Sequence, residues 1–333
     1  MATPIPELIG SPLPAISVIL PVLNEESHLE GAVLSVLSQD YRGPLEIILA
    51  LGPSRDRTNE IATKLASQDN RVKLLDSPTG KTAAGLNLAL AASKSPVVVR
   101  VDGHAQIPNN YISLIVEILN KTGAVNVGGV MAAVGTTAFE RAVAGAMRSP
   151  LGVGASRFHT GGEAGEVDTV YLGAFRREAL VAIGGFDERF TRAQDWELNF
   201  RLRENGGVIY FDPRLHVTYR PRSSVSALAK QYFEYGRWRR VVSRRHSGTI
   251  NYRYLAPPFA LVGFSVSLVL GVLFSSIFFI PALVYLLFVV LASLKISTSI
   301  GEYLLLLLVI PTMHFAWGAG FISSPKTLVP ASQ

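Results

Sequence analysis

The sequence contains no cysteine, which excludes disulfide bonds and thiolate metal sites. We also expect no secretory signal, because the first 14 residues hold four prolines and no apolar run of useful length. We expect residues 1–14 to be a disordered lead-in and the N-terminal domain to stay in the cytoplasm. A P-loop is excluded as well, since Gly80-Lys81-Thr82 would need a glycine where Leu75 stands.

Hydrophobic residues are unevenly distributed along the chain. They make up 49% of the 333 residues, a length that predicts roughly two domains. Residues 1–250 have the composition of an ordinary soluble domain, whereas residues 255–322 are almost entirely apolar. The formal net charge of +6 gathers near Arg237–Arg253, immediately before the apolar region. The sequence therefore predicts a soluble domain followed by a membrane region.

The apolar region is too long for a single membrane span, which takes about 20 residues. Pro281 interrupts its first part, so we predict helices over about 257–277, 280–295 and 301–323. The arginines before the first span place that side in the cytoplasm, and three spans then place the C-terminus outside. A re-entrant hairpin is the alternative. His314 is costly in lipid, and we expect it to pack against protein or to contact an acceptor lipid.

Residues 226–245 predict an amphipathic helix in which aromatic residues stand among arginines. Nucleic-acid binding is one use of such a pattern. The position directly before apolar helices favours instead a helix on the membrane surface, where each arginine near anionic lipid contributes about 1 kcal/mol. We therefore expect membrane lipid as a partner and no nucleic acid.

The N-terminal part alternates apolar runs with helical patterns. Helices are predicted over about 29–37, from 58 to 66 and over 82–92, between strands at Ile16–Leu20, Leu45–Leu51, Val72–Leu75 and Val97–Val101. This alternation is typical of right-handed βαβ units and a mostly parallel sheet, an α/β fold. All four strands end in polar or glycine-containing turns, where a nucleotide site forms in such sheets.

The middle of the chain is less regular. Residues 126–166 are rich in glycine and alanine and give no clear assignment, and residues 158–163 resemble a mobile loop that can act as a lid. Later segments predict a helix from about residue 195 and strands at Val170–Phe175, Val208–Phe211 and His216–Tyr219.

The strand at Val97–Val101 ends in Asp102-Gly103-His104. On an extended segment Asp102 and His104 point to the same side, so they can share a cation. The alternative is a strand that stops at a polar turn. Lys81 opens a helix and can meet a phosphate there, or it is a solvated surface lysine. Asp195 stands near a helix start, where a carboxylate often serves only as a cap.

Several short segments follow one another in an order that resembles family 2 glycosyltransferases with the GT-A fold. They are Pro21-Val22-Leu23-Asn24-Glu25-Glu26, Gly80-Lys81, Asp102-Gly103-His104, Phe175-Arg176-Arg177, Gly184-Gly185-Phe186-Asp187 and Gln194-Asp195-Trp196-Glu197-Leu198. Residues 100–104 and 167–171, with the apolar C-terminal helices, look most like the membrane-attached glucosyltransferases of succinoglycan-type exopolysaccharide synthesis.

The resemblance implies a Rossmann-like GT-A fold, a nucleotide-sugar donor, a divalent cation (Mn²⁺ or Mg²⁺) and inversion at the anomeric carbon. Asp102 and His104 stand at the family's Asp-x-Asp positions and would hold the cation against the donor diphosphate. Asp195 would be the general base on the acceptor hydroxyl. The donor would also contact Pro21, Asn24, Glu25, Asp56 and Lys81, and the acceptor would contact Trp196, Arg237 and Trp238.

The chain departs from the family pattern at four places. Leu51-Gly52 replaces an aspartate pair that reads the base, and Asp56 is expected to substitute in part. His104 replaces an aspartate, which favours Mn²⁺ over Mg²⁺. Gln194 replaces a glutamate beside Asp195, which should keep the pKa of Asp195 lower than a paired carboxylate would have. Glu234 replaces the glutamine of the processive enzymes, and we expect transfer of a single sugar.

The resemblance therefore predicts an inverting glycosyltransferase at the cytoplasmic membrane face, acting on a lipid-linked or polysaccharide acceptor in exopolysaccharide or cell-envelope synthesis. A polyprenyl-phosphate sugar synthase and a non-catalytic membrane scaffold are the alternatives. The expected domains are the lead-in, the glycosyltransferase domain over 15–225, a basic interface helix over 226–254, the membrane region over 255–323 and a tail over 324–333.

Overall fold

The computed structural model describes residues 13–329. Most of the predicted lead-in and the last residues of the tail lie outside these described residues. The chain forms two compact units. Residues 13–132 and 161–219 make up the first unit, and residues 133–160 and 220–329 make up the second.

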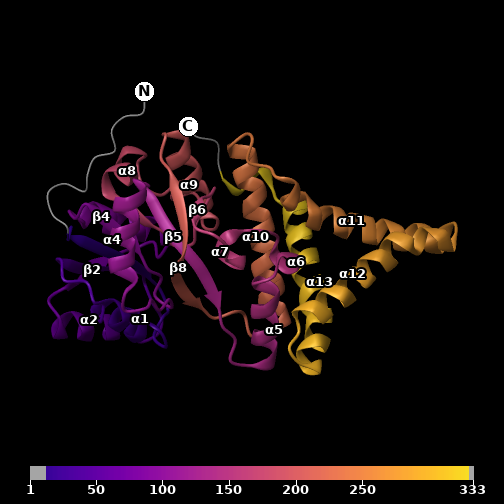
Figure 1. The fold of residues 1–333 in the computed structure, drawn as a ribbon, viewed down its shortest axis with the longest axis horizontal. Helices are drawn as coiled ribbons and strands as arrows, with labels where there is room; N and C mark the ends of the chain where they lie inside the picture. The colour runs from indigo at the N-terminus through magenta and orange to yellow at the C-terminus, as the bar shows by residue number, and fades with distance from the viewer. Residues whose placement is uncertain (1–12, 330–333) are drawn as a thin grey trace. The chain divides into compact units, whose positions relative to one another are not determined.

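The first unit is built on an eight-stranded sheet with the order β3-β2-β1-β4-β7-β5-β8-β6 (Figure 1). The first four strands are parallel, as predicted. Strand β7 is antiparallel to both β4 and β5. The strands are β1 (Ile16–Val22), β2 (Leu45–Leu51), β3 (Val72–Asp76), β4 (Val97–Arg100), β5 (Asn126–Ala133), β6 (Gly165–Glu166), β7 (Ala174–Arg176) and β8 (Ile209–Tyr219).

Both faces of the sheet are buried. Successive side chains of the central strands point to opposite faces, so neighbouring residues of one strand belong to different cores. Val18 and Leu20 belong to one core, and Ile19 between them belongs to the other. The first core is completed by α1 (Leu29–Leu37), α2 (Thr58–Gln68) and α4 (Tyr111–Thr122). The second core is completed by α3 (Thr82–Ala92), α8 (Arg177–Ala182) and α9 (Gln194–Glu204).

Three predictions for the middle of the chain differ from the structure, the last of them only in part. The strand expected at Val170–Phe175 begins only at Ala174, because Leu172 and Gly173 have positive φ and turn the chain. The two strands expected between 208 and 219 are one strand, β8, in which Pro213 is exposed. The expected loop over 158–163 begins in a short helix, α7 (Arg157–Thr160).

The second unit is helical. It contains α5 (Ala138–Met147), α6 (Pro150–Val153), α7, α10 (Val225–Arg245), α11 (Tyr252–Leu273), η1 (Ser276–Phe279), α12 (Ile280–Ile296), α13 (Ile300–Ser323) and η2 (Lys326–Leu328). Three of its segments are long and apolar enough to cross a membrane: 252–273, 276–296 and 300–323. The prediction of three apolar C-terminal helices is therefore confirmed, although the first begins five residues earlier than expected.

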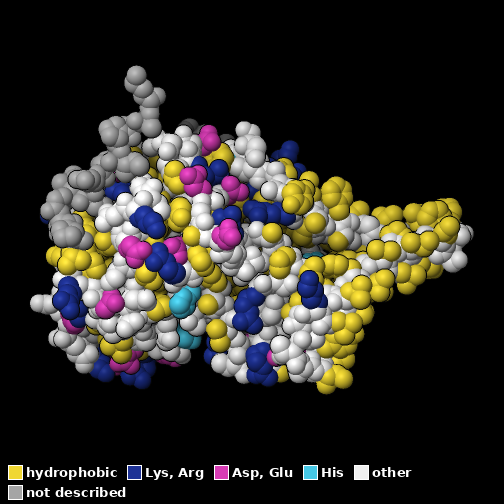
Figure 2. Space-filling model, viewed as in Figure 1, with side chains coloured by type: hydrophobic (Ala, Val, Ile, Leu, Met, Phe, Trp, Pro, Cys, Tyr) yellow, Lys and Arg dark blue, Asp and Glu magenta, His cyan; other side chains and the backbone are white. Residues whose placement is uncertain are grey.

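Within this unit, α11 and α12 form a hairpin whose surface is hydrophobic along its length (Figures 1 and 2). Helices α10 and α13 approach each other at two glycines. A Cβ on Gly236 would lie 2.0 Å from the Trp317 carbonyl oxygen, and one on Gly320 would lie 2.0 Å from the Phe233 carbonyl oxygen. Small residues at such crossings let helix backbones approach closely.

Candidate active site

The carboxyl ends of β1 and β2 carry two loops that are tied together by hydrogen bonds. The Asn24 backbone N–H donates to Ser54 Oγ at 3.1 Å, and Asn24 Oδ1 accepts from the Arg55 N–H at 2.8 Å. Asn24 has a φ of 55°, a left-handed conformation that asparagine tolerates better than most residues. The Glu25 N–H donates to Thr58 Oγ1 at 2.7 Å. These contacts fix the loop that follows β1.

Asp56 takes part in the same network. Its Oδ1 accepts from the Thr58 N–H at 3.1 Å, and its Oδ2 accepts from the Glu26 N–H at 3.2 Å. The Thr58 hydroxyl also donates to Asp56 Oδ1. This bond, followed by those from the backbone N–H groups, lowers the pKa of Asp56. Both carboxylate oxygens are thus engaged in holding the loops, and a role for Asp56 in reading a base stays a prediction.

Two further predicted donor residues lie on neighbouring elements. Pro21 lies in β1 opposite Ala50 of β2. Lys81 is the residue that precedes α3, and its side chain is exposed. Because β1 to β4 are parallel, the turn at Lys81 and the turn at Asp102 follow the same edge of the sheet. The first unit therefore gathers these residues at one edge, as a nucleotide site requires.

The turn after β4 brings Glu25 against His104. His104 Nδ1 lies 2.7 Å from Glu25 Oε1. A Cβ on Gly103 would lie 3.0 Å from Glu25 Cγ, so the glycine provides the room that the glutamate side chain occupies. The sequence predicts that Glu25 contacts the donor, and this stays a prediction; in the structure its carboxylate holds the His104 imidazole.

The donor set at this turn offers only part of the coordination shell that a divalent cation needs. Within residues 13–329, no three His, Cys, Asp or Glu side chains gather in a way that could hold a metal ion. Asp102 and His104 offer one carboxylate and one imidazole, so phosphate oxygens and water would have to complete the coordination, as in many nucleotide enzymes. With Nδ1 held by Glu25, His104 would coordinate through Nε2, the common arrangement of a metal-binding histidine.

Arg100 joins the predicted metal ligand to the predicted base. Its Nε and Nη2 donate to the two oxygens of Asp102 at 3.0 and 3.3 Å. Its Nη1 donates to Asp195 Oδ1 at 2.6 Å. The arginine side chain is only 6% exposed. The structure thus brings Asp102 and Asp195 together through Arg100, a residue to which the sequence analysis gives no role.

Two residues that position Asp195 have an unusual backbone conformation. Leu172 and Ala193 each have a φ of 59°, although neither is a glycine. The Leu172 N–H hydrogen-bonds to the Asp195 carboxylate, and Ala193 caps the start of α9, whose first turn contains Asp195. Non-glycine residues in this region cost about 1–2 kcal/mol each. Such outliers cluster at functional sites, which supports a functional role for Asp195.

Burial raises the pKa of Asp195 to about 6; Arg100 opposes this shift and the charge of Asp102 adds to it. The sequence analysis expects this pKa to be lower than a glutamate beside Asp195 would make it, and that comparison stays a prediction; in the structure the neighbouring charge comes from Asp102. The Asp195 side chain is still 25% exposed, so an acceptor can reach it. A carboxylate with this pKa can accept a proton near neutral pH.

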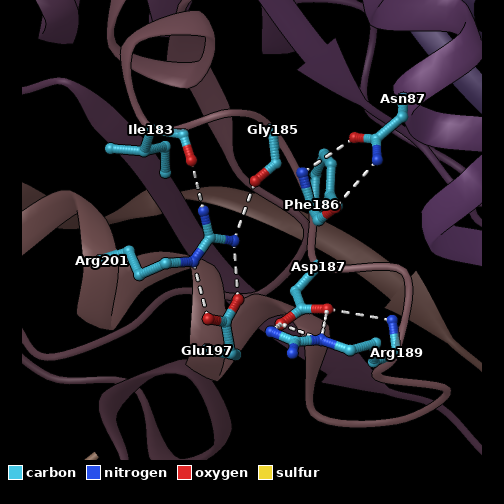
Figure 3. Close-up of polar contacts among 8 residues, drawn as sticks. All are labelled: Asn87, Ile183, Gly185, Phe186, Asp187, Arg189, Glu197 and Arg201. Atoms are coloured by element: carbon cyan, nitrogen blue, oxygen red, sulfur yellow. Dashed lines mark hydrogen bonds and ion pairs between the residues drawn. The ribbon is translucent and has the colours of Figure 1, made fainter. Parts of the chain in front are cut away.

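A second arginine fixes the turn that precedes α9 (Figure 3). Arg201 donates to the carbonyl oxygens of Ile183 and Gly185, both at 2.8 Å, and to both oxygens of Glu197 at 2.7 Å. Asn87 Nδ2 donates to the Phe186 carbonyl at 2.8 Å, and the Phe186 N–H donates back to Asn87 Oδ1. This network was missed from the sequence, although Glu197 and Arg201 have the spacing of a helical ion pair.

The predicted acceptor residues fall in both units. Trp196 follows Asp195 at the start of α9 and is half-buried. Arg237 and Trp238 lie on α10 in the second unit. Arg237 pairs with Glu234 at 2.8 Å, and Trp238 is buried. Contact of these three residues with an acceptor stays a prediction.

Comparison with known proteins identifies similar sequences. Residues 17–184 match the model of the glycosyl transferase family 2 domain. The chain is 34% identical over 242 residues to the succinoglycan biosynthesis protein ExoA of Rhizobium meliloti (strain 1021), a match that covers 72% of this chain and 73% of that protein. It is 24% identical over 254 residues to the dolichyl N-acetyl-alpha-D-glucosaminyl phosphate 3-beta-D-2,3-diacetamido-2,3-dideoxy-beta-D-glucuronosyltransferase of Methanococcus voltae, covering 73% of this chain and 77% of that protein.

Among solved structures, the mannosyltransferase PcManGT from Pyrobaculum calidifontis in complex with GDP-Man and Mn²⁺ has a similar fold. The superposition covers 96% of this chain and 88% of that chain, with a TM-score of 0.66 and 20% identity. At this identity the likeness concerns the fold, and it agrees with the predicted GT-A architecture.

Proposed function

Because the chain belongs to glycosyl transferase family 2, we propose that this glycosyltransferase moves one sugar from a nucleotide-sugar donor to a lipid-linked acceptor, with inversion at the anomeric carbon. The observation that carries the proposal is the Arg100 bridge, which holds a donor-side carboxylate, Asp102, and an acceptor-side base, Asp195, in one site. The likeness to a succinoglycan biosynthesis protein supports a place in exopolysaccharide or cell-envelope glycan synthesis.

On the donor side, Asp102 and His104 would hold a divalent cation, and Glu25 would keep the His104 ring in the orientation that coordination needs. When bound, the cation supplies positive charge that helps the nucleoside diphosphate leave. Lys81 and the N-terminus of α3 follow the same edge of the sheet and would attract the diphosphate. The GDP-Man complex of a protein with this fold supports a nucleotide-sugar donor.

On the acceptor side, Asp195 would remove the proton from the acceptor hydroxyl as its oxygen attacks the anomeric carbon. Attack from the face opposite the leaving diphosphate inverts the configuration at that carbon. General bases of this kind typically contribute about 10²–10⁴-fold in rate. Arg100 and the Leu172 N–H hold the carboxylate in place during this step.

The second unit supports an acceptor that is carried by a lipid. Its three apolar segments can cross a membrane, and the arginines of α10 precede the first of them. This charge distribution favours a cytoplasmic location for the catalytic unit. The relative from Methanococcus voltae is named for a dolichyl-linked sugar phosphate, which supports an acceptor of this class.

The proposal is tested with the full chain in membranes, Mn²⁺, a panel of nucleotide sugars and a lipid extract. We expect one donor to be consumed and a new glycolipid to form in which the sugar is joined to another sugar. A product with the sugar joined directly to one phosphate would identify a polyprenyl-phosphate sugar synthase instead. Absence of transfer with every donor and acceptor would overturn the proposal.

The rate of transfer should depend on the protonation of Asp195. Its pKa is about 6, and only the deprotonated carboxylate can act as a base. Lowering the pH through this value protonates the group, so kcat/KM for the acceptor should fall about tenfold per pH unit below it and level off above it. Donor binding measured over the same pH range serves as the control. A pH profile that stays flat down to about pH 5 would contradict this prediction.

The histidine at position 104 should set the metal preference. At matched free concentrations we expect higher turnover with Mn²⁺ than with Mg²⁺, because imidazole is a softer ligand than carboxylate. His104→Asp should reduce or reverse this difference, whereas His216→Asp, on the exposed face of β8, should leave it unchanged. A wild-type turnover with Mg²⁺ equal to that with Mn²⁺ would contradict the prediction.

A further inference from the structure

Arg100 occupies a position where a charged residue is costly. It is the last residue of β4, a central strand whose other residues are three valines, and it pairs with Ile19 of β1. Only 6% of its side chain is exposed. A guanidinium that is removed from water in this way destabilises the fold unless its hydrogen bonds and its charge are both satisfied.

Two carboxylates provide both the hydrogen bonds and the opposite charge. One is two residues away in the sequence, and the other is 95 residues away. Asp102 accepts from Nε and Nη2, and Asp195 accepts from Nη1. The three donor atoms belong to one planar group, so their relative positions are fixed. Whatever places the guanidinium therefore also sets the separation and orientation of the two carboxylates.

The guanidinium itself has little freedom to move. The backbone N–H of Arg100 donates to the Gly173 carbonyl oxygen at 3.0 Å. The N–H of the preceding residue, Leu172, bonds to Asp195. The strand that carries Arg100 is paired on both sides, with β1 and with β7. The arginine is thus carried by a strand that is hydrogen-bonded on both sides, and Asp195 accepts from both Arg100 and the Leu172 N–H.

We propose that Arg100 is a positioning residue that locks the Asp195 base to the donor-side Asp102, so that the acceptor hydroxyl and the anomeric carbon meet in one fixed geometry. This inference rests on the proposed function of the site. Small displacements of reacting groups lower rates steeply, by about 10²-fold for a shift of about 1 Å. Arg100 therefore acts on the chemical step through the two carboxylates that it holds.

The test replaces Arg100 with lysine, which keeps the positive charge but cannot bind two carboxylates through a planar fork. We expect kcat for sugar transfer to fall about 10²-fold, with a much smaller rise in the donor KM, because Arg100 also holds Asp102. Arg176→Lys is the matched control. Arg176 is equally buried, on the adjacent strand β7, and donates to the carbonyl oxygens of Leu119 and Ala124. That variant should lose thermal stability and keep kcat. An unchanged kcat in Arg100→Lys, or a rise in donor KM that matches the fall in kcat, would overturn the proposal.

A second measurement needs neither transfer nor a folded Arg100 variant. The midpoints of thermal unfolding are compared for Asp102→Asn, Asp195→Asn and the double variant, in detergent. If both carboxylates share Arg100, the double variant leaves the guanidinium without a carboxylate partner. The decrease in its unfolding midpoint should then exceed the sum of the two single decreases by on the order of 5 °C. Additive midpoints would show that the two carboxylates are not joined. If the wild-type chain transfers no sugar, the proposed function fails, and this comparison alone decides whether Arg100 links them.

Discussion

Asp195→Asn is expected to lower kcat for sugar transfer by about 10²–10⁴-fold, because an amide cannot accept the proton of the acceptor hydroxyl. The substitution keeps the size of the side chain and an oxygen that can accept from Arg100 Nη1. The fold and the affinity for the nucleotide should therefore be preserved. Measurement of kcat alongside binding of the nucleoside diphosphate separates the loss of chemistry from a loss of donor binding.

The matched control for Asp195 is Asp168→Asn. Asp168 belongs to the same unit, its side chain is 56% exposed, and it lies 3.9 Å from Arg203. We expect this variant to keep the wild-type kcat. An Asp195→Asn enzyme that retains its turnover would show that the base is another group. An equal loss of kcat in the Asp168→Asn variant would show that removing a negative charge from this unit lowers kcat wherever the charge stands.

Glu197→Gln is expected to lower the free energy of unfolding by about 3 kcal/mol. The Glu197 carboxylate is 2% exposed and binds Arg201, which also holds the carbonyl oxygens of Ile183 and Gly185. The neutral amide leaves a positive charge without its partner in a site with little water. Arg201 itself is 24% exposed, so the loss lies at the lower end of the range for buried pairs.

Unfolding by urea measures this effect, and a surface pair provides the contrast. Arg57 and Glu60 have the spacing of a helical pair, but their side chains are 72% and 69% exposed. Glu60→Gln should therefore change the free energy of unfolding by less than about 1 kcal/mol. Equal losses in the two variants would mean that burial does not strengthen the Glu197–Arg201 pair.

The sequence was informative where structure depends on local patterns. The valines at 97–99 and the alternation of apolar runs with helices predicted the parallel strands, and α1 and α3 have the predicted bounds. The apolar C-terminal helices followed from length and composition alone. These features require no knowledge of which distant segments meet.

The sequence was uninformative where distant residues meet or where the backbone departs from its usual conformation. Arg100 and Asp195 are 95 positions apart, and nothing in the valine-rich strand indicates which carboxylates its arginine will reach. Leu172 has no local signal for a left-handed conformation, so the segment was assigned to a strand. The antiparallel insertion of β7 between β4 and β5 likewise depends on pairing between distant segments.

The left-handed residues beside Asp195 have a consequence for engineering this protein. Glycine at position 172 or 193 would relieve a backbone cost of about 1–2 kcal/mol, and selection for heat resistance alone would tend to favour it. Glycine would also widen the range of conformations open to the segments that orient Asp195. Stability and turnover are therefore in conflict at these two positions, and a thermostable variant of this enzyme should be sought by changes elsewhere.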